Sequence, residues 1–305
     1  MNNQSFIEKL GYSSTDKVVI LHIDDMGFSH SSNIASFECL DFGAATSGSA
    51  IVPSPWFLET ASICRNNPKY DVGVHLTLTC EYELFRWRAL STIDHKTGLL
   101  DNEGCLWRTS EEAVKYVNPE AAEKEMRTQI QVAIANGIDV THIDTHMGTV
   151  IYPKFIQSYL MLAKEFNIPA FLPRLSREDI EAKGYGEFAE AYFNFLPQLE
   201  ASGIPLLDQI IIDTGREQPD KTKYYCDYLS EIKPGLTHLL FHPAKMSPEL
   251  KAITPDSAVW RDQDYKVFTD QQIKECIKKY DLKLIGYREI KDYLRQRNSS
   301  ESTNN

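Results

Sequence analysis

The sequence predicts an α/β fold, namely a TIM-like (β/α) barrel of seven or eight parallel strands, in a regular or an irregular form. Two observations support this: short apolar runs alternate with helical patterns along the chain, and ionisable residues recur where several of these runs end. Active sites of parallel α/β barrels lie at that end of the strands. A chain of 305 residues is long enough for one such barrel with insertions. We therefore expect one catalytic domain over residues 1–298 and a disordered tail over residues 299–305.

Six apolar runs have the length and the β-branched content of buried strands. They cover residues 18–23, 47–52, 72–78, 140–145, 210–213 and 236–242. Helical patterns separate them, as parallel strands require, because the chain must cross back over the sheet between two such strands.

The helices carry recognisable start and stop signals. Asn118 is suited to cap a helix whose first residue is Pro119 and which ends near Gly137. Residues 269–270 begin another helix, and a last helix should cover about residues 287–297.

Two segments interrupt the alternation and are predicted to be insertions. Residues at about 81–117 are rich in aromatic and turn-forming residues and too long for a plain connection, so they should form a lid or a wall of the site. Residues at about 176–205 should form a second, largely helical insertion.

The composition excludes several classes of function. With 32 basic and 43 acidic residues the net charge is −11, which argues against nucleic acid or an anionic membrane as a partner and favours a small-molecule substrate that is neutral or locally steered. No apolar run is long enough to cross a bilayer, and the first residues do not resemble a signal peptide, so we expect a cytoplasmic protein. The sequence leaves open whether the chain forms a homodimer.

The six cysteines are scattered and show no CxxC spacing. Neither a zinc knuckle nor a disulfide framework is indicated, so we expect all six to be reduced, with Cys276 on the apolar face of a helix.

Ionisable residues fall at the ends of four predicted strands. They are Asp24 and Asp25, then His75, then Asp144 and His146, and finally His242. Each alone would fit a turn, a helix cap or a hydrogen-bonded core position. Burying all of them without a metal or a partner would be costly, so their coincidence favours a site.

Local geometry supports this reading. Asp24 and Asp25 would point to opposite faces of a continuous strand, but Gly27 allows the backbone to turn there and aim both carboxylates at one cavity. His142, Asp144 and His146 are spaced by two and share one face if the chain is extended.

Five motifs resemble those of one known family. LHIDDMGFSHSSN, GVHLTLT, THIDTHMG, FHP and WRDQDY together are similar to the YdjC-like carbohydrate deacetylases, which include chito-oligosaccharide deacetylases. The resemblance covers about residues 10–294. It implies metal ligands at Asp25, His75 and His146, a general base at Asp24, and a general acid or oxyanion partner at His242. Many members carry a run of histidines where this chain continues His146-Met147-Gly148, so contacts made by those later histidines do not transfer.

The resemblance implies one divalent metal ion, magnesium, whereas the imidazole ligands also suit zinc. Three protein ligands and an open position are typical of catalytic metal sites, where the ion activates water for hydrolysis. The predicted reaction is removal of an N-acetyl group from an amino sugar or a short chito-oligosaccharide, and the substrate is implied by the resemblance alone.

Two alternatives remain. A metal-dependent phosphoester or other C–O hydrolase would favour a phosphate-binding loop, and no Gly-rich loop is visible near the strand ends. A catalytically silent sugar-binding barrel would need neither the base Asp24 nor His242.

Other polar and aromatic residues near the motifs carry weaker signals. Asp144 and His142 either orient a metal ligand or make buried structural hydrogen bonds. For the remaining candidates, core position or ordinary packing is the better expectation than contact with a ligand: His22, Trp87, Trp260 and Arg261.

Overall fold

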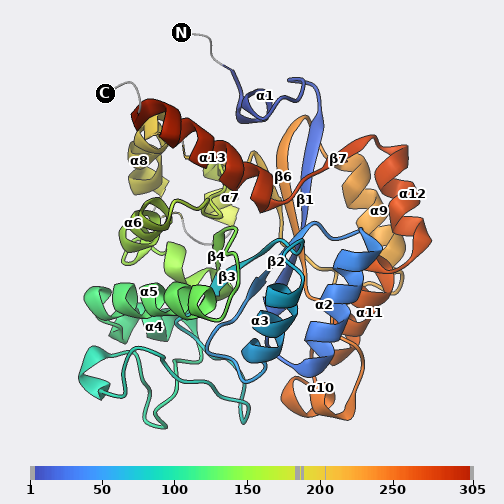
Figure 1. Ribbon diagram of the computed structural model, residues 1–305. Helices are drawn as coiled ribbons and strands as arrows, with labels where there is room; N and C mark the ends of the chain where they lie inside the picture. Colours follow the sequence, from blue (N-terminus) through green and yellow to red (C-terminus); the bar gives the residue numbers. More distant parts are fainter. Residues whose placement is uncertain (1–3, 183–185, 187–188, 203, 303–305) are drawn as a thin grey trace.

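The computed structural model describes residues 4–182, 186, 189–202 and 204–302. Its strands form a curled parallel sheet with helices packed around it (Figure 1), which confirms the predicted α/β class. The strands of the described residues are β1 (Lys17–Met26), β2 (Ser47–Ala50), β3 (Val72–Leu76), β4 (Ile143–Thr145), β5 (Gln209–Ile211), β6 (Gly235–Phe241) and β7 (Leu282–Leu284).

The long strand β1 organises the sheet. The strand order is β4-β3-β2-β1-β6-β5, and β7 also pairs with β1. One edge of β1 pairs with β6 from Lys17 to Ile23. The other edge is shared, because β7 pairs with residues 17–19 and β2 with the stretch from His22 to Met26. The polar end of β1 therefore lies between β2 and β6, at the centre of the sheet.

The sheet does not close into a continuous barrel. Between its edge strands β4 and β5, an irregular segment makes only isolated bridges, so the expected barrel takes its irregular form and stays open among the described residues. The backbone N–H of Phe171 donates to the Ile143 carbonyl at 2.8 Å, and that of Arg174 donates to the Leu207 carbonyl at 2.8 Å. Pro173 lies between these two contacts and has no N–H to extend a ladder. The result is a curled sheet whose open side is spanned by this segment.

Helices cover the sheet and carry the connections. They are α1 (Phe6–Lys9), α2 (His30–Phe42), α3 (Phe57–Asn66), α4 (Ser110–Tyr116), α5 (Pro119–Ala135), α6 (Ile156–Phe166), α7 (Arg177–Ala182), α8 (Ala189–Ser202), α9 (Lys221–Glu231), α10 (Pro248–Ile253), α11 (Ala258–Phe268), α12 (Gln271–Lys279) and α13 (Tyr287–Ser302), with 3₁₀ turns η1 (His95–Thr97) and η2 (His146–Ile151).

The helix start signals in the sequence correctly located α5 and α12. The helix α5 begins at Pro119, and α12 begins after Asp270, whose side chain accepts a hydrogen bond from the Gln272 N–H at 2.7 Å. All six predicted strands are present, whereas β7 was missed because three residues are too few to show a periodicity. The helix α13 continues to Ser302, into the predicted tail, and residues 303–305 lie outside the described residues.

The two predicted insertions differ in structure. The segment 81–117 contains η1 and α4 and is otherwise irregular, and its irregular part lies below α4 and α5 in Figure 1. The segment 176–205 forms α7 and α8, as its helical pattern predicts. Residues 183–185, 187–188 and 203 of this second insertion lie outside the described residues.

One face of β1 changes from apolar to polar along its length. At its amino end, Val18 and Ile20 pack in a small hydrophobic cluster with Ile7 and with residues of α13 such as Ile290. The next residue on this face is His22, which is fully buried. The apolar cluster therefore seals the amino end of the sheet, and the polar side chains begin above it.

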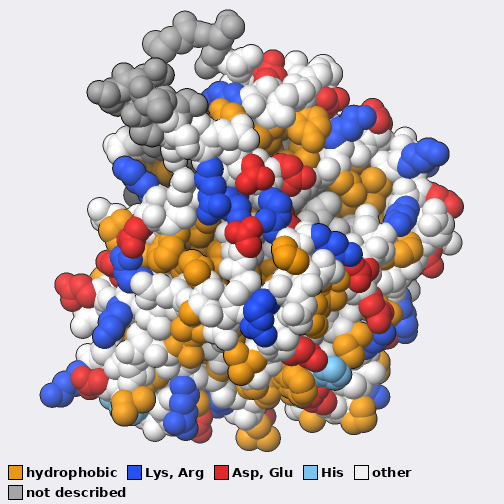
Figure 2. All heavy atoms as spheres, viewed as in Figure 1, with side chains coloured by type: hydrophobic (Ala, Val, Ile, Leu, Met, Phe, Trp, Pro, Cys, Tyr) orange, Lys and Arg blue, Asp and Glu red, His pale blue; other side chains and the backbone are white. Residues whose placement is uncertain are grey.

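The charged side chains on one face of the surface are mixed in sign. On the face shown in Figure 2, Lys and Arg side chains are interspersed with Asp and Glu side chains. None of the helices in the described ranges combines the length and apolarity needed to cross a membrane.

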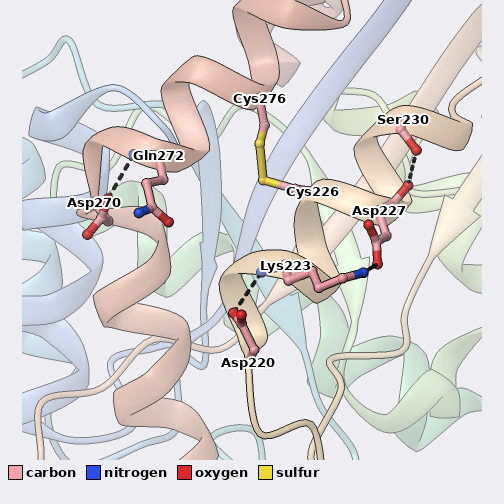
Figure 3. The surroundings of a disulfide bond; sticks show 8 residues. All are labelled: Asp220, Lys223, Cys226, Asp227, Ser230, Asp270, Gln272 and Cys276. Carbon is pink, nitrogen blue, oxygen red and sulfur yellow. Dashed lines mark hydrogen bonds and ion pairs between the residues drawn. A yellow bond between two sulfur atoms is a disulfide. The ribbon is translucent and has the colours of Figure 1, made fainter.

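A disulfide between α9 and α12 corrects one prediction. Cys226 and Cys276 form a disulfide with an S–S distance of 2.04 Å (Figure 3), so the expectation that all six cysteines are reduced is wrong for this pair. The other four cysteines are free. The two cysteines are 50 residues apart in sequence, and no spacing pattern links them. They come together because α9 and α12 pack side by side.

We expect this disulfide to stabilise the fold by about 2 to 4 kcal/mol, because it closes a long loop in the unfolded chain. The double variant Cys226→Ser with Cys276→Ser should unfold at lower denaturant concentration than the oxidised protein. Reductant should lower the midpoint of the wild type and leave that of the double variant unchanged. Equal midpoints for the oxidised and reduced wild type would contradict this expectation.

Candidate functional site

The backbone at the end of β1 brings two adjacent carboxylates to one place. The pairing register of β1 shifts between Ile23 and Met26, and Asp25 adopts a left-handed conformation with φ of 64°. Aspartate tolerates this conformation better than most non-glycine residues, but it still costs free energy. Gly27 also has a positive φ of 84°, so the turn expected at Gly27 begins two residues earlier. Because of this turn, both carboxylates lie beside His75, instead of on opposite faces of the strand.

Asp25, His75 and His146 converge as predicted. Asp25 Oδ1 lies 3.4 Å from His75 Nε2 and 3.3 Å from His146 Nδ1, and the three candidate ligand atoms lie within 4.8 Å of one another. All three residues are buried. Asp25 Oδ1 makes no hydrogen bond within the part of the chain that the structure describes. A buried carboxylate oxygen that makes no hydrogen bond and faces two imidazole nitrogens fits a cation site.

Two other groups could hold a metal by distance alone, and both include Asp144. They are His22 with His142 and Asp144, and Asp24 with His75 and Asp144. The Asp144 oxygens are already engaged, because one accepts from Ser49 Oγ at 2.6 Å and the other contacts His75 Nδ1 at 2.8 Å. The group around Asp25 is therefore the better cation site.

Two carboxylates lie behind the two imidazoles. Asp144 Oδ1 contacts His75 Nδ1 at 2.8 Å, which leaves His75 Nε2 facing Asp25. Glu81 Oε2 contacts His146 Nε2 at 2.9 Å, which leaves His146 Nδ1 facing Asp25. Carboxylates commonly occupy this position behind a metal-binding histidine. The sequence left the role of Asp144 open and missed Glu81, which lies at the start of the first insertion.

The polar layer below these residues explains the remaining histidines of the strands. His22 Nε2 lies 3.0 Å from Asp144 Oδ2, and His22 Nδ1 lies 2.8 Å from Ser47 Oγ. His142 lies deeper and stacks on Tyr287 with ring centroids 3.9 Å apart. His22 is thus buried as expected, and its ring contacts the carboxylate that orients His75.

Asp24 and His242 lie together at one side of the cluster. Asp24 Oδ2 is 3.8 Å from His242 Nε2 and 3.9 Å from His75 Nε2. Neither Asp24 Oδ1 nor His242 Nδ1 makes a hydrogen bond within the described ranges. The backbone N–H of His242 donates to Asp264 at 3.1 Å, and Lys221 forms a buried ion pair with the same carboxylate. The position of His242 is therefore supported by α9 and α11.

The carboxylates of the site differ in their acidity. Burial raises the pKa of Asp24 to about 6, although His75 and His22 oppose this shift. Burial would also raise the pKa of Asp25, but the Arg261 guanidinium and the His146 imidazole hold it well below its usual range. Asp25 is therefore ionised at neutral pH, and Asp24 titrates close to neutrality, as suits a general base.

The imidazoles differ as well. Burial would lower the pKa of His75, but Asp144 and Asp24 hold it well above its usual range. Glu81 likewise outweighs burial and raises the pKa of His146 to about 9. Burial, aided by Arg261 and opposed by Asp25, lowers the pKa of His242 to about 3. Without a bound cation, His242 would be neutral at pH 7, whereas His75 and His146 would be protonated.

Arg261 makes a contact that the sequence did not predict. Its Nη2 donates to Asp25 Oδ2 at 2.8 Å, and both side chains are buried. The expectation of ordinary packing is therefore wrong for Arg261. Packing does describe Trp87, whose Nε1 donates to the Thr79 carbonyl at 2.9 Å, and Trp260, which lies edge-on to His242 at 5.5 Å.

The start of the first insertion forms an aromatic wall beside the site. The ring centroids of Tyr82 and Phe28 are 5.0 Å apart, and those of Phe85 and Phe28 are 5.7 Å apart. Trp87 lies 6.1 Å from the His146 ring. The insertion thus contacts both the turn that follows Asp25 and the histidine of β4's carboxyl end.

Comparison with known proteins agrees with this architecture. The chain matches the family model described as YdjC-like protein over residues 18–279. It is 31% identical over 277 residues to the carbohydrate deacetylase of Thermus thermophilus, covering 90% of this chain and 94% of that protein. It is 27% identical over 161 residues to the chitooligosaccharide deacetylase of Citrobacter koseri, covering 53% of this chain and 61% of that protein.

A solved structure supports the fold. A protein of Enterococcus faecalis V583, provisionally assigned to cellobiose-phosphate cleavage, superposes with a TM-score of 0.71 at 24% identity. The superposition covers 90% of this chain and 99% of that one. At this level of identity the similarity concerns the fold alone.

We expect a divalent cation that binds at Asp25, His75 and His146 to release about two protons at pH 7, because both imidazoles must lose a proton before they can act as ligands. Affinity should therefore increase as the pH rises toward about 9. Calorimetric titration of the chelator-treated protein in buffers of different ionisation enthalpy measures the number released. A count near zero at pH 7 would show that the histidines are not protonated in the metal-free state.

Proposed function

The chain belongs to the YdjC-like family of carbohydrate deacetylases, and we propose that it uses one divalent cation to remove an N-acetyl group from an amino sugar or a short chito-oligosaccharide. The observation that carries this proposal is the convergence of Asp25, His75 and His146 beside the pair Asp24 and His242. The relatives described as carbohydrate and chitooligosaccharide deacetylases support the substrate class.

Asp25, His75 and His146 would hold the cation. Their donor atoms are one carboxylate oxygen and two imidazole nitrogens, and Asp25 Oδ1 lacks another partner among the described residues. This set suits zinc, whereas the resemblance to the family implies magnesium. A divalent cation supplies Lewis acidity, which polarises a carbonyl and makes a coordinated water easier to deprotonate.

Asp24 is proposed as the general base. It is adjacent to Asp25 and carries a buried oxygen without a hydrogen bond, and its pKa of about 6 allows it to be ionised at neutral pH. Asp24 accepts the proton of the attacking water and can later deliver it to the leaving amine. Asp24 Oδ2 lies 3.8 Å from His242 Nε2, which supports the proposal that both groups act on the same carbonyl.

His242 is proposed to stabilise the oxyanion. With a pKa lowered to about 3 it is neutral, so it offers one N–H donor and does not begin the reaction as an acid. An aimed N–H donor in a buried site stabilises the negative charge that develops on the carbonyl oxygen. The support from Asp264 to its backbone keeps this donor in place.

Arg261 balances the charge of the site. Its ion pair with Asp25 occupies Oδ2 and leaves Oδ1 directed toward the two imidazoles. Arg261 therefore orients Asp25 and keeps it ionised.

We also propose that the protein acts in the cytoplasm, where its four free cysteines would stay reduced. The Cys226–Cys276 disulfide argues against a cytoplasmic location, because disulfides persist mainly in oxidising compartments. Fractionation of the native source with thiol trapping would decide between the two.

The reaction is tested by the products. We expect the metal-loaded protein to release acetate and a free amine from at least one of N-acetylglucosamine, diacetylchitobiose or their 6-phosphates, and we expect a chelator to abolish this. Release of inorganic phosphate without acetate would favour a phosphoester hydrolase. Binding of these sugars without any product would favour a silent sugar-binding barrel.

The base is tested by Asp24→Asn, which is nearly isosteric. Turnover should fall about 100-fold or more while the cation stays bound, whereas His75→Ala should lose the cation. In the wild type, kcat/KM should fall as the pH is lowered through about 6 or below, since Asp24 must be ionised and a bound cation would lower its pKa further. Full activity of Asp24→Asn would remove Asp24 from the mechanism.

A further inference from the structure

We propose that Glu81 is a positioning residue of the cation site: it accepts the Nε2 proton of His146 and thereby fixes which nitrogen of that ring is free for the cation. This inference rests on the proposed cation site. It also gives the first insertion a direct role in the site, because Glu81 is the first residue of that insertion.

The two imidazoles present opposite nitrogens. His75 faces Asp25 with Nε2 and contacts Asp144 with Nδ1, whereas His146 faces Asp25 with Nδ1 and contacts Glu81 with Nε2. A neutral imidazole has one N–H and one lone pair, and an ionised carboxylate can only accept. Each carboxylate therefore holds the hydrogen on its own side and leaves the lone pair on the other side. Each ring therefore has its own carboxylate, Asp144 for His75 and Glu81 for His146.

His146 depends on such support more than His75 does. His75 lies within the strand β3, whose backbone pairs with both β2 and β4. His146 lies beyond the end of β4, at the start of η2, where Met147 and Gly148 have positive φ values of 52° and 69°. No strand pairing of the described residues includes His146, so its ring position rests on side-chain contacts. These are the contact of Nε2 with Glu81, the contact of Nδ1 with Asp25, and the neighbouring rings of Trp87 and His75.

Glu81 itself is held at this place. Its neighbour Tyr82 is buried and packs on Phe28, close to the turn that carries Asp25. Farther along, Trp87 Nε1 donates to the Thr79 carbonyl and closes the segment back on itself. The Glu81 side chain is 30% exposed and the His146 side chain is 5% exposed, so Glu81 reaches the ring from the rim of the site.

The test is cation binding to chelator-treated full-length protein. Titration with Zn²⁺ and with Mg²⁺ should show a Kd about 10- to 100-fold weaker for Glu81→Ala than for the wild type. Glu81→Gln should fall between the two, because its amide oxygen can still accept the Nε2 proton. Glu83→Ala is the matched control, since Glu83 lies two residues away on the same segment and is exposed, and its Kd should not change.

Two further measurements separate positioning from a structural role. Thermal unfolding of the metal-free proteins should give the same midpoint for Glu83→Ala and the wild type, and a lower one for Glu81→Gln, which loses the ion pair with His146. In the Zn²⁺-loaded wild type, the ¹⁵N shifts of His146 should show a protonated Nε2 and a ligating Nδ1, and this signature should be lost or mixed in Glu81→Ala. If Glu81→Ala does not fold, Glu81→Gln decides by the same criteria.

The outcomes are distinguishable. A wild type that binds neither ion would overturn the proposed cation site and, with it, this inference. A wild type that binds while Glu81→Ala binds equally tightly would overturn the role of Glu81 alone. A lowered unfolding midpoint with unchanged cation affinity would likewise reduce Glu81 to a structural contact.

Discussion

Burial of negative charge at the carboxyl end of β1 is the constraint on which the rest of this structure depends. Asp24, Asp25 and Asp144 are all buried within a small volume. An ionised carboxylate in such a place costs several kcal/mol unless it is paired and hydrogen-bonded. Arg261 and the surrounding imidazoles supply part of the compensation, and the open oxygen of Asp25 is where a cation would supply the rest.

The interior of the curled sheet is layered to meet this constraint. At the amino end of β1, Val18 and Ile20 pack with apolar residues of α13, and this cluster keeps water away from that end of the sheet. Above it, His22 and Asp144 form a hydrogen-bonded layer that orients His75 from behind. A buried polar network of this kind is stable only when its polar groups have hydrogen-bond partners. The same hydrogen bonds restrict the orientation of the imidazole rings. The candidate metal ligands and Asp24 lie next to this layer.

The two halves of the chain support different sides of the site. The first insertion contacts His146 through Glu81 and places its aromatic residues beside the turn at Asp25. The carboxyl-terminal half supports His242, because Lys221 at the start of α9 pairs with Asp264, which holds the His242 backbone. The disulfide links α9 to α12 and thereby stabilises the packing of these helices in the carboxyl-terminal half (Figure 3).

The sequence by itself determined the class of fold, most strand and helix positions, and the residues that meet at the strand ends. It could do so because periodicity, capping and the parallel topology are local or nearly local properties, and parallel strands bring their ends to one edge. It could not show the left-handed Asp25, the ion pair of Arg261 with Asp25, or the contact of Glu81 with His146. Nor could it show the disulfide or the irregular closure of the sheet. Each of these joins residues through packing of distant elements, and the free energy of such contacts depends on burial and geometry that only the tertiary structure decides.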